Sequence, residues 1–316
     1  MCKLYFTRGS ALLSALFIMT MVAIAATAMG TRLQLDIYRT RLSILSDKLY
    51  LASEAVTFWS MNQLKRKQAF TANKYGQILR LPGNLANIYP EVTLSGAVYD
   101  MQALFNLNNL TEKNYKPVFL RLLQLKLPKL SPQQGNVIYE ATKSWISDYQ
   151  PGKGQEKWMN IYARAKPPYL SGCQLMVSVS EFRLISGITV ENYQLLSPFI
   201  TVLPEVTPLN INTMPPSLLG ILGKGLKESE IADLVQARGA RGFKNIAEAT
   251  RALGKLQIPT EQITVESKYF LTTAKVTLED LNLNVFVLLK RMPNQTATDP
   301  DMPFQVSIIS ESYNTL

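Results

Sequence analysis

Histidine is absent from the 316-residue sequence, and cysteine occurs only at Cys2 and Cys173. Without histidine the chain has no Ser-His-Asp or Cys-His catalytic site and no histidine-ligated zinc site. A nucleophile motif of the G-x-S-x-G type is missing as well. Because no histidine can activate Cys173, it is predicted to be a small core residue and not a nucleophile. These absences predict a protein that is not an enzyme.

Acidic residues are scarce relative to basic ones, with 23 Asp and Glu against 33 Lys and Arg and a formal net charge of +10. Such an excess is typical of proteins that bind nucleic acid or a membrane surface. The basic residues are spread thinly, however, and their longest cluster is Lys65-Arg66-Lys67. A solvated basic surface is therefore favoured. With 47% hydrophobic residues, the chain can bury a sizeable core in more than one domain.

Residues 10–30 carry no formal charge, and about twenty such residues are enough to cross a bilayer as one helix. Apolar residues continue at helical spacing beyond this run, and neither proline nor a turn pair interrupts residues 31–67. We expect one helix from about Ser10 to about Arg66, with its first half in lipid and its second half packed on a folded domain. A cleaved signal peptide stays open as an alternative, because residues 25–28 (AATA) also fit a small-residue cleavage site.

Beyond the long helix, the pattern predicts strands on both sides of a helical region. Turn formers in residues 81–93 end the helical pattern, and residues 94–99 are expected to form a strand before an Asn-rich bend. Residues 269–277 and 283–291 alternate as in an antiparallel hairpin, with a third strand in residues 304–310. Short helices are expected between these strands. Predicted helix caps are Thr111, Ser131 and Ser178.

The N-terminal architecture resembles that of type IV pilins and type II secretion pseudopilins. A basic leader, MCKLYFTRG, precedes the apolar run. In those families a prepilin peptidase cuts after a glycine like Gly9, which leaves Ser10 as the first mature residue. Their subunits usually carry a glutamate at mature position five, but this chain has Ser14. Because a carboxylate in lipid is costly unless paired, its presence or absence decides which neighbours a subunit accepts.

Several motifs, in the same order along the chain, resemble one family of this group, the type II secretion minor pseudopilin K family. They are DMQALFNLNNL, a W-I-x-D-x-Q-P loop, PPYLSGCQL, SVSEFRLISG, LLSPFITVLP and LNINT. The similarity covers nearly the whole chain. That family lacks the glutamate at mature position five, so Ser14 agrees with the resemblance.

The resemblance implies a non-enzymatic subunit at the tip of the pseudopilus, which initiates or caps the fibre during protein export across the outer membrane. The implied partners are the minor pseudopilins I and J, other pseudopilins, the inner-membrane assembly platform, the prepilin peptidase and the lipid bilayer. No nucleic-acid partner is expected. The implied location is a single pass through the bacterial inner membrane, with a methylated N-terminus and the globular part in the periplasm.

The fold class expected is α+β, with a long hydrophobic pilin-like helix packed on a small antiparallel sheet and a large all-α domain inserted. The expected segments are a leader at 1–9, the transmembrane helix at 10–30, the periplasmic half of the long helix at 31–80, a loop and first strand at 81–102, the inserted domain at 103–258, and the C-terminal strands at 259–316.

Related K subunits place acidic calcium ligands in a W-x-D-x-D loop and a G-x-E-D segment. Here Ser147, Tyr149 and Lys157 occupy positions that are acidic in those relatives. Calcium takes about six to eight oxygen ligands, largely carboxylates and carbonyls. Asp148 and Glu156 remain as weak candidates, so neither a metal nor any other cofactor is expected.

Residues 209–254 suggest a second function, because they resemble helix-hairpin-helix modules that grip DNA phosphates through hairpin amides and basic side chains. The candidate phosphate-binding residues are Lys224, Lys227, Arg238, Arg241 and Lys244. Acidic residues occur in the same segment, and a second Gly-x-Gly hairpin is missing. A structural bundle is favoured, and a membrane-anchored DNA-binding protein for DNA uptake is kept as the alternative.

Overall fold

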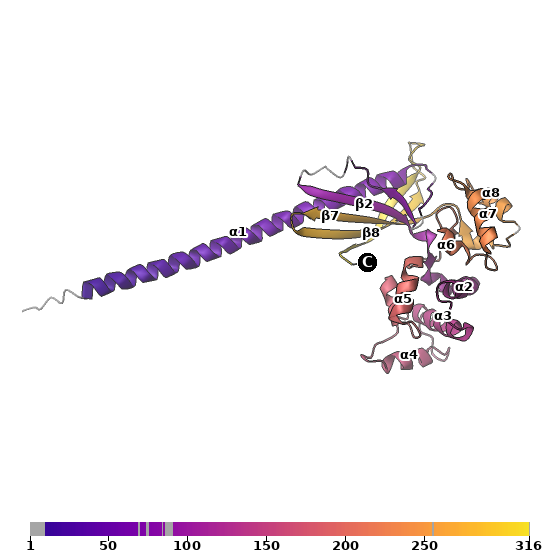
Figure 1. Ribbon diagram of the computed structural model, residues 1–316, viewed down its shortest axis with the longest axis horizontal. Helices are drawn as coiled ribbons and strands as arrows, with labels where there is room; N and C mark the ends of the chain where they lie inside the picture. The colour runs from indigo at the N-terminus through magenta and orange to yellow at the C-terminus, as the bar shows by residue number, and fades with distance from the viewer. Residues whose placement is uncertain are drawn as a thin grey trace, which may run out of the picture.

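The computed structural model describes residues 10–68, 70–73, 76–83, 85, 91–254 and 256–315. Helix α1 (Ser10–Lys65) is a single helix of 56 residues, which at 1.5 Å per residue makes a rod of about 84 Å. The rod projects far beyond the rest of the molecule (Figure 1). Its first buried residue is Leu45, so the N-terminal half is exposed and the C-terminal half packs on the folded part. The predicted long helix is confirmed.

The C-terminal half of α1 lies on a five-stranded antiparallel sheet with the order β1-β2-β7-β8-β9. The strands are β1 (Gln77–Arg80), β2 (Val92–Asp100), β7 (Tyr269–Leu278), β8 (Leu281–Pro293) and β9 (Phe304–Tyr313). β7 and β8 form the predicted hairpin, in which Leu278 pairs with Leu281 around a two-residue turn. The fold class, a long helix on an antiparallel sheet with a helical region between strands, is confirmed.

Close contact between helix and sheet depends on a glycine. A Cβ atom at Gly96 in β2 would lie 2.5 Å from Cγ1 of Val56 in α1 and 3.1 Å from the carbonyl oxygen of Thr273. Gly96 therefore lets α1 approach the sheet closely. Alternate residues of each strand face the helix. The core that forms between helix and sheet is mainly aliphatic.

We call α1 and the five-stranded sheet the sheet part, and residues 101–268 the insert. The chain enters the insert after Asp100 and returns to the sheet at Tyr269. Its α-helices are α2 (Lys116–Lys126), α3 (Pro132–Ile146), α4 (Glu156–Ala163), α5 (Val190–Leu196), α6 (Pro216–Leu219), α7 (Glu228–Arg238) and α8 (Ile246–Leu253). Its 3-10 helices are η1 (Met101–Ala103), η2 (Leu107–Thr111), η3 (Lys113–Tyr115), η4 (Val179–Leu184), η5 (Ser197–Phe199) and η6 (Thr260–Gln262).

The sequence analysis predicts an all-α insert, but the insert also contains strands. Two short parallel strand pairs bring distant parts of it together. The pairs are β3 (Phe105–Asn106) with β4 (Ile200–Thr201), and β5 (Leu209–Asn210) with β6 (Ile263–Thr264). Strands of two residues leave no alternating pattern in a sequence, which is why periodicity does not reveal them.

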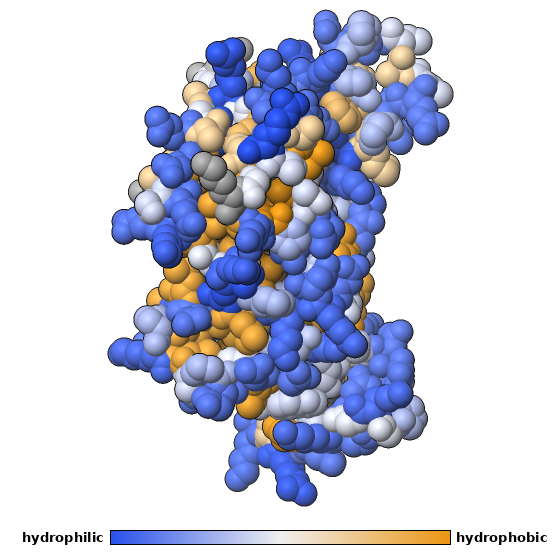
Figure 2. All heavy atoms as spheres, turned by 90° about the vertical axis from the view of Figure 1, so that its right-hand side faces the viewer, coloured by the Kyte–Doolittle hydropathy of each residue, from blue (hydrophilic) through white to orange (hydrophobic). Residues whose placement is uncertain are grey.

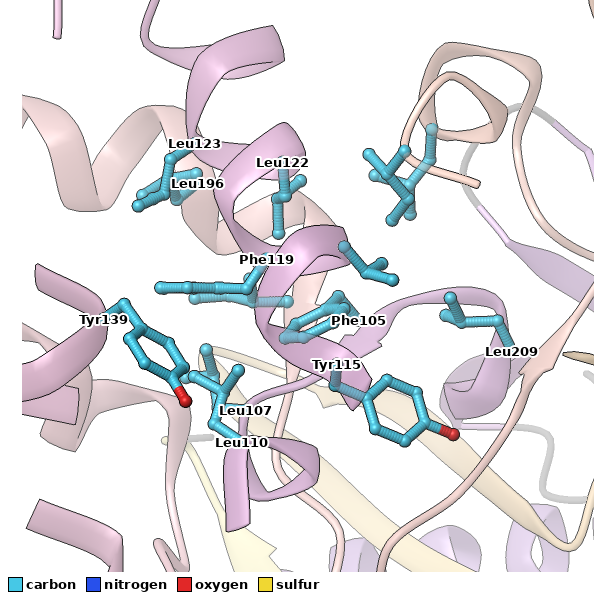
Figure 3. Packing of buried hydrophobic residues seen from close by; sticks show 14 of the residues in the cluster. Phe105, Leu107, Leu110, Tyr115, Phe119, Leu122, Leu123, Tyr139, Leu196 and Leu209 are labelled. Carbon is cyan, nitrogen blue, oxygen red and sulfur yellow. The ribbon is translucent and has the colours of Figure 1, made fainter. Parts of the chain in front are cut away.

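Aromatic rings and leucines pack together in the centre of the insert, as Figure 3 shows around Phe119. The ring centroid of Phe119 lies 5.7 Å from that of Phe105 and 6.4 Å from that of Phe182. These rings are fully buried together with leucines of α2. Such packing gives the insert a core of its own, separate from the aliphatic core under α1.

Some local boundaries differ from the sequence prediction. α1 ends at Lys65, and β1 occupies part of segment 31–80, which the sequence pattern assigns to the long helix. Thr111 does not cap an α-helix, because η3 lies between it and α2, and its hydroxyl donates to the Asn108 carbonyl. Ser131 does cap α3, as predicted. Ser178 has the predicted capping box, but the helix that it opens is the 3-10 helix η4.

Candidate functional site

The apolar segment of α1 satisfies its hydroxyl groups within its own helix. The Ser14 hydroxyl donates to the Ser10 carbonyl at 2.8 Å, and the Thr20 hydroxyl donates to the Phe17 carbonyl at 2.8 Å. The hydroxyls of Thr27 and Thr31 likewise donate to carbonyls one turn earlier. The segment is exposed throughout and has a mean hydropathy of 2.2. It therefore presents an apolar cylinder with no carboxylate at position 14.

Two predicted positions concern processing of the N-terminus. Ser10 is the first residue of α1. Gly9 lies outside the described residues.

Above the apolar segment, α1 exposes a line of large apolar side chains that we call the exposed stripe. It consists of Ile37, Ile44, Leu51 and Phe58, which are seven residues apart and between 52% and 63% exposed. Seven residues make nearly two helical turns, so all four lie along one side of the helix. Single exposed apolar residues are ordinary, but a row at this spacing is typical of a helix that packs against another helix.

Charged residues lie on the same half of α1. Arg41 donates two hydrogen bonds to the Glu279 carboxylate in the β7–β8 turn, at 2.8 and 2.9 Å. Burial, and then the charge of Glu311 in β9, raise the pKa of Glu54. Among the described residues, neither Glu54 nor Asp47 forms an ion pair in the isolated chain.

The junction between sheet part and insert is built around a buried carboxylate. Asp100 ends β2 and is 1% exposed. Its Oδ2 accepts hydrogen bonds from Thr213 Oγ1 at 2.5 Å, Ser267 Oγ at 2.7 Å and Asn210 Nδ2 at 3.0 Å. Its Oδ1 accepts one from the Gln102 amide at 2.9 Å. Burial raises the pKa of Asp100, and the hydrogen bonds oppose that rise.

The LNINT motif therefore has a structural role at this junction. Asn210 and Thr213 reach Asp100, while Asn212 donates to the carbonyls of Phe243 at 2.9 Å and Val265 at 3.1 Å. The motif links the start of α6, the loop before α8 and the return to the sheet. The sequence alone does not reveal these contacts, because they join residues far apart in the chain.

The Asn-rich bend after β2 works in the same way inside the insert. Asn108 is 1% exposed, and its Nδ2 donates to the carbonyls of Met176 at 3.0 Å and Leu203 at 2.8 Å. Its Oδ1 accepts from the Met176 amide at 3.0 Å. Side-chain amides thus satisfy loop backbone that the core removes from water.

The two weak calcium candidates, Asp148 and Glu156, lie on either side of the loop that contains Gly152. The Glu156 carboxylate accepts a hydrogen bond from the Gly152 amide at 2.7 Å, and that bond lowers its pKa most strongly. Among the described residues, no hydrogen bond joins the side chain of Asp148 to Glu156. No group of three or more acidic, cysteine or histidine side chains that could hold a metal occurs among the described residues.

The buried side-chain amide of Gln155 lies among several backbone carbonyls at the end of α3 and in the loop after it. The Gln155 side chain donates through Nε2 to the carbonyls of Ser147 and Asp148, each at 3.2 Å, and of Ser144 at 3.5 Å. Its Oε1 accepts from the Gln150 amide at 2.7 Å. Carbonyl oxygens of this kind are calcium ligands when a cation lies between them. Here a neutral NH₂ group lies between them, so the residues present do not fit a calcium ion.

The basic residues of the DNA-binding alternative differ in burial. Arg238 points inward and donates to the carbonyls of Ile211 at 2.9 Å and Met214 at 2.8 Å, and burial lowers its pKa. The hairpin amide of Gly225 donates to the Leu222 carbonyl. The remaining basic candidates, Lys224, Lys227, Arg241 and Lys244, are exposed. Arg238 and the Gly225 amide thus make their contacts within the chain.

Cys173 is half-buried, with a φ of 46°, and lies in the loop before η4. It is not a core residue as predicted. Its place in a loop, outside the helices and strands that form the core, accounts for the difference, because connecting segments run over the surface.

Comparisons with known proteins agree with this architecture. Two family models described as "Type II secretion system (T2SS), protein K" match residues 103–205 and 209–266, which together make up half of the chain. The type II secretion system protein K of Klebsiella pneumoniae is 28% identical over 310 residues, which cover 90% of this chain and 92% of the relative. That of Aeromonas hydrophila is 29% identical over 240 residues, 68% of this chain and 69% of the relative.

A solved structure has the same fold. It is the crystal structure of the GspK-GspI-GspJ complex from the type 2 secretion system of enterotoxigenic Escherichia coli, with a chain that matches at a TM-score of 0.66 and 19% identity. The match covers 88% of this chain and 100% of that one. Together with the family matches, the membrane-length helix and the sheet interrupted by a helical insert, this places the chain in the type II secretion system protein K family of non-enzymatic minor pseudopilins.

Proposed function

We propose that this chain is the tip subunit of the pseudopilus, where it initiates or caps the fibre during protein export across the outer membrane. The observation that best supports this proposal is that the exposed apolar surface of α1 and the insert lie at opposite ends of one molecule. The membrane-length segment and the exposed stripe lie along α1, and the insert lies at the opposite end (Figure 1). A subunit of this shape joins a fibre through its helix, while its insert blocks addition of a further subunit above it.

Ser14 supports this position. A subunit that accepts a neighbour above it needs a carboxylate in lipid for that neighbour's N-terminal ammonium, and an unpaired carboxylate there is costly. Ser14 has no charge, and its hydroxyl donates within α1. The end of the molecule opposite the N-terminal part of α1 also supports a position at the tip. Hydrophilic side chains project from it, and hydrophobic ones lie in recesses between them (Figure 2).

The partners we propose are the minor pseudopilins I and J, through the exposed stripe, as well as other pseudopilins and the inner-membrane assembly platform. The solved complex contains related I and J subunits with a K subunit. Leu51→Asp in the full-length chain should abolish co-purification with I and J, because it places a charge in a helix-helix contact. Val137→Asp, at an exposed position of α3 in the insert, is the matched control and should leave it intact. Equal loss in both variants would refute the stripe as the contact.

Position in the fibre has its own test. An epitope inserted after Gly152, where an added Cβ atom would meet nothing within 4 Å, should be labelled by gold-tagged antibody at one end of each overproduced pseudopilus. Labels along the fibre length would overturn the tip assignment. In the same system Ser14→Glu should reduce incorporation, whereas Ser14→Ala should not.

We further propose a single pass through the inner membrane, with the globular part in the periplasm, and cleavage by prepilin peptidase between Gly9 and Ser10, followed by methylation. Support comes from the family and from the length of the apolar segment. N-terminal sequencing of protein from cells with and without the peptidase tests it. A mature chain that begins at Ser10 only when the peptidase is present is expected, and a chain that begins near Met29 would contradict it.

The insert, we propose, folds without calcium because Gln155 takes the place of a cation among the loop carbonyls. Millimolar calcium or a chelator should leave the melting temperature of the full-length chain unchanged. Gln155→Glu supplies a carboxylate beside the same carbonyls and should make the melting temperature rise with calcium. A calcium-dependent rise in the unaltered chain would refute this proposal.

A further inference from the structure

A cavity of about 440 Å³ opens where the far end of the sheet meets the insert. Its lining comes from five separate parts of the chain. They are the segment after α1, Asn212 of the LNINT motif, the loop before α8, residues 265–266 before β7, and strands β8 and β9 with their connection. The charged and aromatic lining residues include Lys67, Phe70, Lys244, Glu266, Arg291 and Phe304. The volume is within the range of small-ligand pockets.

Arg291 occupies a core position at this cavity. Alternate residues of β8 face inward, and Val285, Val287 and Leu289 are buried in that series. Arg291 continues the series and is only 5% exposed. A guanidinium at a position that the strand pattern reserves for an apolar residue is costly without a partner for its charge.

The partners of Arg291 within the chain are incomplete. Its guanidinium carbon lies 3.5 Å from the ring centroid of Phe304 and 5.4 Å from that of Phe70. One terminal nitrogen donates to the Arg66 carbonyl at 3.2 Å, and the buried Nε has no hydrogen-bond partner among the described residues. No carboxylate of the described chain forms an ion pair with it.

Charge around the cavity is predominantly positive. Burial lowers the pKa of Arg291 to about 10, with Glu266 and Asp100 opposing, so the group stays charged at neutral pH. Lys67 and Lys244 are exposed lining residues, and Glu266 is the acidic side chain among the lining residues. The described lining thus has three cationic groups and one anionic group beside aromatic rings.

We propose that this cavity is a binding site for a carboxylate attached to an apolar group, as at the C-terminus of a polypeptide that ends in an apolar residue. The carboxylate would receive hydrogen bonds from Arg291, whose planar fork matches two oxygens, and the adjoining apolar group would contact the rings of Phe70 and Phe304. Lys67 and Lys244 would attract the anion at the mouth. The inference is independent of a position at the fibre tip.

The ligand test uses the full-length chain in detergent micelles and isothermal titration calorimetry. N-acetyl-phenylalanine should bind, and its neutral amide should bind at least tenfold more weakly, because the amide cannot replace a charged hydrogen-bond acceptor. N-acetyl-Ala-Ala-Phe with a free carboxylate, compared with the same peptide amidated and with N-acetyl-Ala-Glu-Ala amide, separates a chain end from an internal acidic side chain. Equal affinity of acid and amide would overturn the proposal.

Variants locate the site. Lys67→Gln combined with Lys244→Gln should weaken binding of the acid about three- to tenfold, and Lys129→Gln, an exposed lysine between α2 and α3, should not. Arg291→Met removes the buried charge, retains much of the side-chain volume, and should abolish the difference between acid and amide. If Arg291→Met fails to fold, the double lysine variant and its control Lys129→Gln still test whether the acid binds in this cavity. Unchanged affinity in the double lysine variant would refute the site.

Discussion

The sheet part and the insert complete their cores in different ways. In the sheet part an aliphatic core lies between α1 and the sheet, and the outer side of the same helix exposes the stripe at Ile37, Ile44, Leu51 and Phe58. The insert surrounds a core in which aromatic rings pack among aliphatic side chains, and buried amides such as Asn108 satisfy its loops. The sheet part thus exposes large apolar side chains in a row along one helix, whereas those that the insert exposes, such as Leu170, Val177 and Val190, come from several of its segments. Changes at the junction and within each part test this contrast.

The largest effect is expected at the junction. Asp100→Ala removes from the end of β2 the acceptor of four hydrogen bonds and leaves four buried donors of the insert unsatisfied. We expect a loss of about 4 kcal/mol in unfolding free energy, measured by urea unfolding of the full-length chain in detergent. Insert and sheet part should then unfold in separate transitions. A single transition with unchanged stability would show that Asp100 does not couple them.

The same carboxyl makes stability depend on pH. Because its pKa is raised in the folded chain, the folded state holds the proton more tightly than the unfolded state. Its contribution to stability is therefore present below the ordinary pKa of 3.8 and is lost as pH rises from there through the folded pKa. Asp100→Asn cannot ionise, so unfolding measured across this window should show a smaller decline with pH in the variant. Identical slopes would contradict the assignment.

Within the sheet part, Gly96→Ala places a Cβ atom against Val56. Overpacking of this kind costs about 2 kcal/mol, so the melting temperature of the chain should fall. Gly83→Ala is the matched control, because a Cβ at Gly83 meets nothing within 4 Å, and it should change stability by less than about 0.5 kcal/mol.

In the insert, Gln155→Ala removes one buried amide from the convergence of carbonyls. The expected loss is about 1.5 kcal/mol of unfolding free energy, because the hydrogen bonds are long and the loop lies near water. Hydrogen exchange should increase at Gln150, whose amide donates to Gln155. Unchanged exchange there would indicate that water replaces the side chain without cost.

The smallest effect is expected at the Arg41–Glu279 ion pair between α1 and the β7–β8 turn. Both side chains are about half exposed or more, so solvent screens the interaction despite its two short hydrogen bonds. Arg41→Gln should change the unfolding free energy by less than about 0.5 kcal/mol. A larger loss in high salt would show that the contact is not simply electrostatic.

The elements that periodicity predicts are those whose pattern is long. α1 follows from an apolar run with no helix breaker, and the β7–β8 hairpin follows from two alternating segments around a short turn. The cap at Ser131 follows from a local motif. β1, with four residues, and the two-residue parallel strands carry too little pattern to be recognised.

Contacts between distant residues are harder to predict than local elements. The Asp100 cluster joins residues more than a hundred positions apart, and no single segment reveals that Asn210 and Thr213 point toward it. Gln155 looks like an ordinary loop residue until the carbonyls around it are seen. Arg291 does leave a signal, because it interrupts an alternating series of valine and leucine with a charge.

The hydroxyls of Ser14, Thr20, Thr27 and Thr31 each bond to a carbonyl of α1 itself. None of these four hydroxyl groups requires a hydrogen-bond partner outside the helix. Backbone N–H groups of a helix likewise donate to carbonyls one turn earlier. If the rod moves from a shell of acyl chains into a bundle of neighbouring helices, these bonds stay intact on both sides of the transfer. Such a transfer would exchange one apolar environment for another without breaking these four hydrogen bonds.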